Sequence, residues 1–224
     1  MLRQRTSSNN GRFTTADLDF ISSVLAPEGQ RPYLEKLWTD PNALREMLDL
    51  KEVFQNLVNS PQTLRVSPRF YFYVLVRHAF LRAKLTHAGL ADYVAGVMTR
   101  RVSPSPDDPL NNIVGGYTHA SEFISLINRS RGKMRFHLQM AAGNQFLLIS
   151  GLYPDFIKHR SEVLGAPDLE FYESFTQKVF RDAANDSHAA SPVLQKILSD
   201  LSDALPIARN ALNHMADEFV FLGD

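Results

Sequence analysis

The chain has 224 residues, of which 44% are apolar and 21% charged, and its 24 Lys and Arg residues balance its 24 Asp and Glu residues. Such a composition is ordinary for a globular protein with a sizeable core. Because binding nucleic acid through a broad basic surface needs excess positive charge, zero net charge argues against a dedicated nucleic-acid binder. The lack of cysteine excludes disulfides, zinc–thiolate sites, iron–sulfur clusters and cysteine nucleophiles.

No segment of the sequence has the character of a membrane span. The most apolar stretches are residues 70–81, which contain Arg77 and His78, and residues 136–153, which contain His, Gln and Asn side chains. A spanning helix needs roughly 20 mostly apolar residues. The N-terminus, "MLRQRTSSNNGRF", has no apolar stretch after its basic residues, so residues 1–12 are predicted to be a disordered polar tail. We therefore expect a soluble, cytoplasmic protein.

Capping residues predict helices in the first part of the chain. Thr14 or Thr15 can cap a helix through the side-chain oxygen. Asp40, followed by a proline, is typical of a second helix start. The apolar periodicity that follows continues up to Pro61, so this segment is expected to be helical throughout.

Residues 67–83, "SPRFYFYVLVRHAFLRA", are the most aromatic segment of the chain. Aromatic and β-branched residues favour strands. However, the sequence offers few other strands to pair with it, and the run continues into good helix-forming residues. Because a helix that is apolar nearly all round is usually a core helix, we predict a buried central helix over residues 68–85.

The second part of the chain is also predicted to be helical. Residues 102–116, "VSPSPDDPLNNIVGG", are rich in proline and glycine and predict a loop, either a connection between two helical halves or a functional lid. Later helices include a long one containing Gly143 as a close-packing point and another that begins at Pro154. The fold class is therefore all-α, a single domain over residues 13–224 with about eight to eleven helices.

The sequence lacks the short motifs of several large enzyme classes. It contains no Gly-rich phosphate loop, no G-x-S-x-G nucleophile elbow, no H-E-x-x-H zinc helix and no EF-hand loop. We therefore set aside kinase, dinucleotide-binding and hydrolase functions.

Two pairs of residues have the spacing of metal ligands on one helical face. Asp155 and His159 are four residues apart, and His119 and Glu122 are three apart. Helical proteins build two-metal sites from inward carboxylates and histidines. The Asp-x-x-x-His spacing is similar to one ligand pair in the haem-oxygenase-like di-metal oxidases. This resemblance implies an iron or manganese cofactor and an oxidase activity.

The same residues also fit an ordinary structural role. Asp155 and Glu122 fall in the first turns of predicted helices, where a carboxylate stabilises the exposed N–H groups. His159 can then pair with Asp155 as a surface contact. We favour this interpretation, in which no cofactor is needed.

A polar pocket inside the protein is a further hypothesis. Arg77 and His78 interrupt the apolar segment, and a buried charge needs a partner or neutralisation. We favour an internal ion pair, or an arginine that reaches the surface along its aliphatic stem. The alternative is an inner polar site formed by Arg77, His78, His137 and Asn144.

The sequence thus predicts a soluble helical protein whose role is binding a protein partner, or assembly by self-association. The alternative is a metal-dependent oxidase or a small-ligand-binding helical enzyme that uses some of the four candidate ligands, so whether the chain is an enzyme is left open. The sequence does not identify a substrate or a partner.

Overall fold

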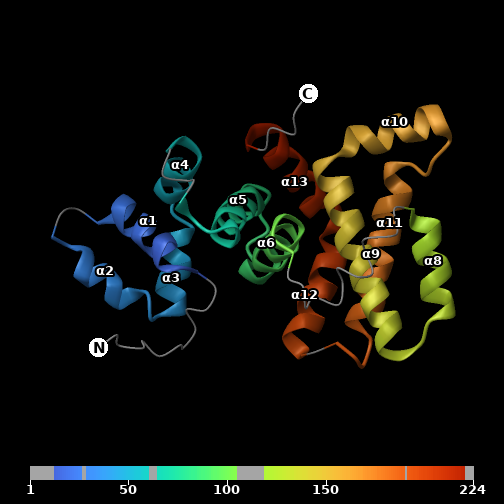
Figure 1. Ribbon diagram of the computed structural model, residues 1–224, viewed down its shortest axis with the longest axis horizontal. Coiled ribbons are helices and arrows are strands. Elements are labelled where there is room, and N and C mark those ends of the chain that lie inside the picture. The colour runs from blue at the N-terminus through green and yellow to red at the C-terminus, as the bar shows by residue number, and fades with distance from the viewer. Residues whose placement is uncertain (1–12, 27–28, 61–64, 105–118, 190, 220–224) are drawn as a thin grey trace. The chain divides into compact units, whose positions relative to one another are not determined.

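The computed structural model describes residues 13–26, 29–60, 65–104, 119–189 and 191–219, and these contain α-helices and no β-strand (Figure 1). The predicted all-α fold class is confirmed. The described residues form 12 helices, slightly more than the eight to eleven expected. None of these helices is both long enough and apolar enough to cross a bilayer.

The contacts of the chain divide it into two compact units, Met1–His78 and Ala79–Asp224, which we call unit 1 and unit 2. The boundary falls inside one helix, α5 (Pro68–Arg82). A single domain over residues 13–224 stays a prediction.

Unit 1 contains α1 (Thr15–Leu25), α2 (Arg31–Leu37), α3 (Pro41–Leu48), α4 (Lys51–Asn59) and the first part of α5. The Thr14 side chain caps α1, as predicted. The carboxylate of Asp17, which is fully buried, accepts hydrogen bonds from the Thr14 N–H at 2.7 Å and from the N–H and hydroxyl of Ser67 at 2.6 and 2.8 Å. A single carboxylate thereby fixes the start of α1 against the start of α5.

The continuous helix expected between Asp40 and Pro61 is wrong. Helix α3 ends at Leu48 and α4 begins at Lys51, because Leu50 adopts an extended conformation (φ −68°, ψ 135°). The Asp49 carboxylate is bound to the Arg77 guanidinium, which holds the chain at this break. This break adds one to the expected number of helices.

The aromatic-rich segment is a helix, as predicted, and most of its apolar side chains are buried. Phe70, Val74, Leu75, Val76 and Phe80 are at most 1% exposed. The helix ends at Arg82, three residues before the expected end. Lys84 has a left-handed conformation (φ 63°), and the Leu85 N–H returns to the Phe80 carbonyl at 2.8 Å, which is the hydrogen-bond pattern of a Schellman motif.

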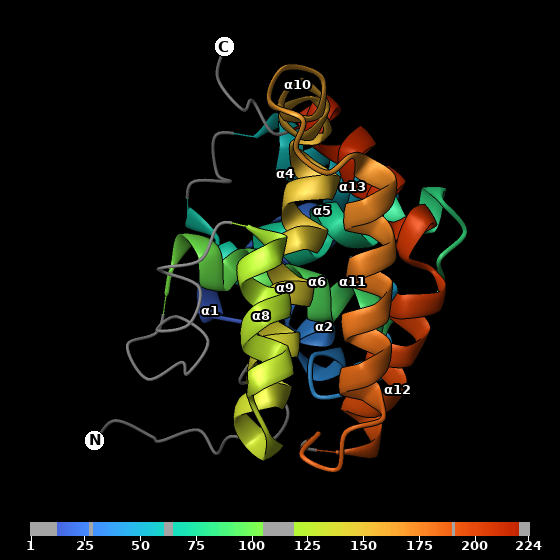
Figure 2. The same ribbon diagram turned by 90° about the vertical axis from the view of Figure 1, so that its right-hand side faces the viewer.

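Unit 2 contains the end of α5 and seven further helices. These are α6 (Ala88–Val102), α8 (Ala120–Arg129), α9 (Gly132–Leu152), α10 (Pro154–Leu164), α11 (Leu169–Ala184), α12 (Pro192–Asp203) and α13 (Leu205–Phe219). Helices α8, α9 and α11 run side by side, and α10 crosses the ends of α9 and α11 (Figures 1 and 2). Residues 105–116 of the predicted loop and the tail 1–12 lie outside the described residues.

Helix α9 is the most buried element of unit 2, and two glycines let its neighbours approach closely. A Cβ atom on Gly143 would lie 2.5 Å from the Phe180 ring of α11, and one on Gly151 would lie 3.0 Å from Leu212 of α13. Gly143 is thus the close-packing point predicted from the sequence. The two contacts place α11 and α13 directly against α9.

Candidate binding surface

Helix α10 is built by clear start and stop signals but buries little of itself. Pro154 occupies its first position, Asp155 lies in its first turn, and Gly165 ends it in a left-handed conformation (φ 63°). Within the helix only Ile157 is buried. An amphipathic helix normally hides a wide apolar stripe, so α10 has apolar positions that its own unit does not cover.

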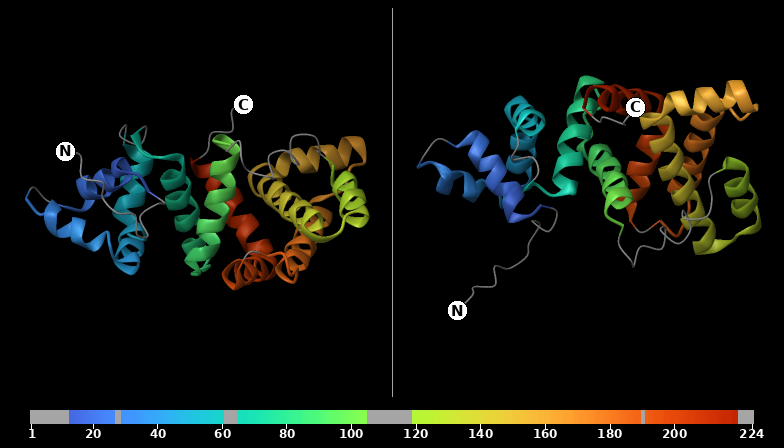
Figure 3. Two further views of the ribbon diagram at one scale, coloured as in Figure 1. Left: turned by 60° about the horizontal axis from the view of Figure 1, so that its bottom comes forward. Right: turned by 45° about the horizontal axis from the view of Figure 1, so that its top comes forward.

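Those uncovered positions are Phe156 near the start of the helix and Val163 and Leu164 at its end. Phe156 and Val163 share one helical face with Arg160, since they are separated by four and three residues, and Leu164 lies next to Val163. Tyr153 precedes the helix and Phe171 comes from α11. We call this set the α10 surface; its exposed fractions are 45% for Tyr153, 53% for Phe156, 62% for Val163, 68% for Leu164 and 38% for Phe171. In Figure 3, α10 (orange) lies at the edge of unit 2.

A shallow cavity, which we call the cup, opens beside the α10 surface. Its cavity volume is about 10 Å³, and its lining residues are Phe146, Ile149, Phe156, Ile157, Arg160 and Tyr172. Sites that enclose a small-molecule ligand usually measure about 300–1,000 Å³. The cup is far below that range and has room for about one water molecule, so it is a shallow dent in the surface.

Arg160 places a positive charge at the edge of the cup. Its guanidinium lies 5.5 Å from the centre of the Phe156 ring, a cation–π geometry. One of its nitrogens lies 3.4 Å from Nδ1 of His119, at the start of α8. Because a guanidinium can only donate, Nδ1 of His119 is the acceptor. In the part of the chain that the structure describes, Arg160 makes no ion pair with a carboxylate.

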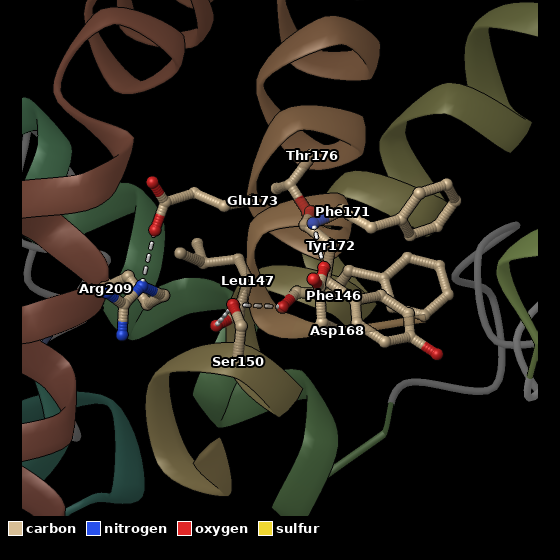
Figure 4. Close-up of polar contacts among 9 residues, drawn as sticks. All are labelled: Phe146, Leu147, Ser150, Asp168, Phe171, Tyr172, Glu173, Thr176 and Arg209. Carbon is tan, nitrogen blue, oxygen red and sulfur yellow. Dashed lines mark hydrogen bonds and ion pairs between the residues drawn. The ribbon is translucent and has the colours of Figure 1, made fainter. Parts of the chain in front are cut away.

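The floor of the cup is held by well-packed residues of α9 and α11. The rings of Phe146 and Tyr172 stack with centroids 5.2 Å apart, and Phe171 lies edge-on to Tyr172. Figure 4 shows these rings together on one side, and on the other an ion pair of 2.7 Å between Arg209 and Glu173. The floor is therefore preformed.

The polar contacts of α11 fix its beginning beside the cup. The Asp168 side chain accepts a hydrogen bond of 2.9 Å from the Phe171 N–H, which caps the helix. The Thr176 hydroxyl donates to the Tyr172 carbonyl at 2.7 Å. Both bonds are drawn in Figure 4. The apolar rings of this turn are thus presented by a fixed backbone.

The four candidate metal ligands take structural positions. Asp155 and His159 are exposed on α10. His119 is the N-cap residue of α8, and its N–H donates to the Glu122 carboxylate at 3.0 Å. No group of three or more histidine and acidic side chains among the described residues could hold a metal ion.

The four residues of the predicted polar pocket divide between the two units. In unit 1, Arg77 forms two hydrogen bonds with Asp49, at 2.7 and 2.6 Å, and the His78 ring stacks on Phe54 at 3.5 Å. The bond to Asp49 also raises the pKa of Arg77. Of the two interpretations favoured from the sequence, an internal ion pair and an arginine that reaches the surface, the ion pair is present.

In unit 2, Asn144 and His137 lie on α9. The Asn144 side chain accepts a hydrogen bond of 2.6 Å from the Tyr93 hydroxyl, and the His137 ring lies beside Phe136. A pocket that joins these residues to Arg77 and His78 stays a prediction.

Sequence reasoning did not find the α10 surface, although a signal was present. The segment "DFIKHRSEVLG" has apolar residues at positions 156, 157, 163 and 164, a stripe wider than a helix with one buried residue needs. Which part of that stripe faces solvent depends on the helices packed against it.

The chain matches no protein family, and comparisons with curated proteins and with solved structures gave no match. The conclusions on function therefore depend on the residues of the α10 surface and the cup.

Proposed function

We propose that the chain is a protein-binding module whose α10 surface docks an apolar segment of a protein partner. The observation that carries this proposal is the set of large apolar side chains that α10 leaves exposed, Phe156, Val163 and Leu164, with Tyr153 just before the helix. Large exposed apolar patches on globular proteins commonly mark interaction sites. An apolar segment of the partner would cover the exposed side chains of α10 and remove them from water.

The composition of the surface supports a protein as the partner. Aromatic residues and arginine are enriched at protein interfaces, and truncation of such residues often costs the most binding energy. The chain has zero net charge, which does not favour nucleic acid. A cytoplasmic location is also part of the proposal, supported by a sequence without cysteine to form disulfides.

Site-specific photo-crosslinking in the cells that make the protein tests this proposal. A photoreactive amino acid replaces Val163 in one variant and Lys158 in another; both positions are exposed on α10, but they lie on opposite faces. We expect a discrete crosslinked protein product from position 163 and much less from position 158. Adding Phe156→Ala should lower the yield at position 163, because it removes one wall of the cup.

Equal yields at the two positions, or no product at either, would contradict the proposal. A product that persists unchanged with Phe156→Ala would show that the partner contacts some other part of the surface.

A further inference from the structure

The connection between α8 and α9 gathers positive charge. Residues 123–154 contain no Asp or Glu, and all of their Lys and Arg residues fall between positions 129 and 135. They are Arg129, Arg131, Lys133 and Arg135, and we call residues 129–135 the basic turn. Since successive cations are two positions apart, their Cα atoms lie within about 7 Å of each other. In a chain of zero net charge, this is a strongly charged local surface.

The cations of the basic turn are available to a partner. The side chains of Arg129, Arg131 and Lys133 are exposed. In the part of the chain that the structure describes, none of these three makes an ion pair with a carboxylate. Met134, which follows Lys133, is 55% exposed. The basic turn therefore presents unpaired cations beside one exposed apolar side chain.

This arrangement of charge opposes the stability of α9. Arg131 is the N-cap residue of this 21-residue helix, whose first turn has neither a side-chain cap nor an acidic residue. The N-terminus of a helix carries partial positive charge, so carboxylates stabilise it and cations destabilise it. Residues that oppose the local structure without a compensating contact are typical of functional positions. An anionic partner would supply the compensating contact.

The neighbourhood of the basic turn restricts the kind of anion that fits. The turn lies beside the connection between α11 and α12 (Figures 1 and 2), where a Cβ atom on Gly132 would be 3.7 Å from Nε2 of His188. That connection holds Asp186, which accepts a hydrogen bond of 2.8 Å from the His188 N–H and is acted on by the charge of Arg135. A nucleic acid carries a negative charge on every nucleotide and would bring phosphates towards this carboxylate. A peptide with spaced acidic residues can avoid it, and each of its carboxylates can accept two parallel hydrogen bonds from an arginine.

We propose that the basic turn is a second docking surface, which binds an acidic segment of a protein partner. Carboxylates of that segment pair with the exposed cations, and a neighbouring apolar side chain packs on Met134. This inference goes beyond the proposed function, because the basic turn and α10 adjoin opposite ends of α9, about 30 Å apart by the length of the helix.

Fluorescence anisotropy with the full chain tests this surface. The probe is a fluorescein-labelled peptide in which glutamates flank a single leucine. We expect the peptide to bind at low salt and to bind more weakly as salt is added, because exposed ion pairs are screened. Arg131→Glu combined with Lys133→Glu should weaken binding by at least about tenfold, since it places like charges together.

Arg31→Glu combined with Lys51→Glu is the matched control. Both residues are exposed, and each is the first residue of a helix, α2 or α4. The control therefore makes the same change in net charge at two other helix N-termini and should leave binding of the peptide unchanged. Circular dichroism checks that both variants fold.

A peptide that does not bind the original chain, or that binds both variants equally well, overturns the inference. A labelled oligothymidylate of the same charge is the competing probe, and tighter binding of this probe than of the peptide would overturn the choice of a protein segment. Photo-crosslinking at position 163 tests the α10 surface separately, so the failure of either proposal is distinguishable from the failure of the other.

Discussion

At the residue scale, the hydroxyl of Tyr93 makes a short polar contact inside unit 2. It donates a hydrogen bond of 2.6 Å to Oδ1 of Asn144, a residue that is 7% exposed on α9. Burial raises the pKa of Tyr93, and the charge of Arg100 opposes the rise. This bond links α6 to the middle of α9.

Tyr93→Phe should lower the free energy of unfolding by about 1–3 kcal/mol, because the buried Asn144 amide loses its partner. The raised pKa of Tyr93 also makes the stability of the folded protein depend on pH in the alkaline range. The stability that Tyr93 contributes is complete below the unfolded-state pKa of about 10 and is lost as the pH rises above it. Urea unfolding between about pH 8 and about pH 10.5 should therefore show a smaller loss of stability in the variant than in the original chain.

Tyr33→Phe is the control for this experiment, since Tyr33 is 71% exposed on α2 and its loss should change little. An alkaline loss of stability identical in all three proteins would contradict the assigned role of Tyr93.

The sequence shows that a buried charged residue requires a partner, but it does not show which residue that partner is. Arg77, inside an apolar run, indicated either an internal ion pair or a side chain that reaches the surface. However, nothing in the sequence indicates Asp49, which lies 28 positions away at the break between α3 and α4. Likewise the spacing of His119 and Glu122 fits both a cap and a ligand pair, and only the backbone conformation distinguishes a capping contact.

At the element scale, the packing of α11 on α9 depends on the absence of a side chain at Gly143. The Cβ position of this residue lies 2.5–2.9 Å from three atoms of the Phe180 ring, and Phe180 is fully buried. A ring enclosed on all sides cannot move away without disturbing its neighbours.

Gly143→Ala should therefore destabilise the protein, although alanine is the better helix former. We expect a loss of about 1–2 kcal/mol, since overpacking of about 1–3 kcal/mol exceeds the gain in helix propensity of about 0.5–1 kcal/mol. For a chain of this size the melting temperature should fall by about 2–4 °C per kcal/mol. Ser174→Ala, at an exposed position on α11, is the control and should change stability by less than about 0.5 kcal/mol. A variant at Gly143 that melts at or above the original temperature would show that Phe180 can shift freely.

Helix starts and stops are well predicted where a chemical signal exists, as at Pro154 and Gly165 of α10. The break between α3 and α4 has no proline or glycine, and the apolar periodicity continues across it. Tertiary contacts decide such a break: Asp49 turns towards Arg77, and the helix does not continue. Local patterns cannot predict it for that reason.

At the scale of the whole molecule, the all-α class follows from composition and periodicity, whereas the division into two units does not. The boundary at His78 and Ala79 has no proline, glycine or charged linker to mark it, because it lies within α5. The α10 surface likewise could not be predicted from the sequence, because the exposure of a side chain depends on how the helices pack.

The metal-dependent alternative also belongs to this scale. Since the described residues hold no group of three potential ligands, we expect purified protein to carry no stoichiometric iron or manganese by elemental analysis. Adding either ion should leave the melting temperature unchanged. Bound metal that is lost in His159→Ala but kept in His214→Ala, another exposed helical histidine, would restore the oxidase hypothesis.

The course of α5 across the boundary has a practical meaning for work on fragments of this protein. A fragment that stops at residue 78 would end in the middle of helix α5. A fragment that starts at residue 79 would begin with the last, unsupported turn of α5 and would expose Phe80, which is buried in the whole protein. Truncation at the unit boundary would therefore destabilise both fragments, and fragments intended to fold should keep the whole of α5 in one of them.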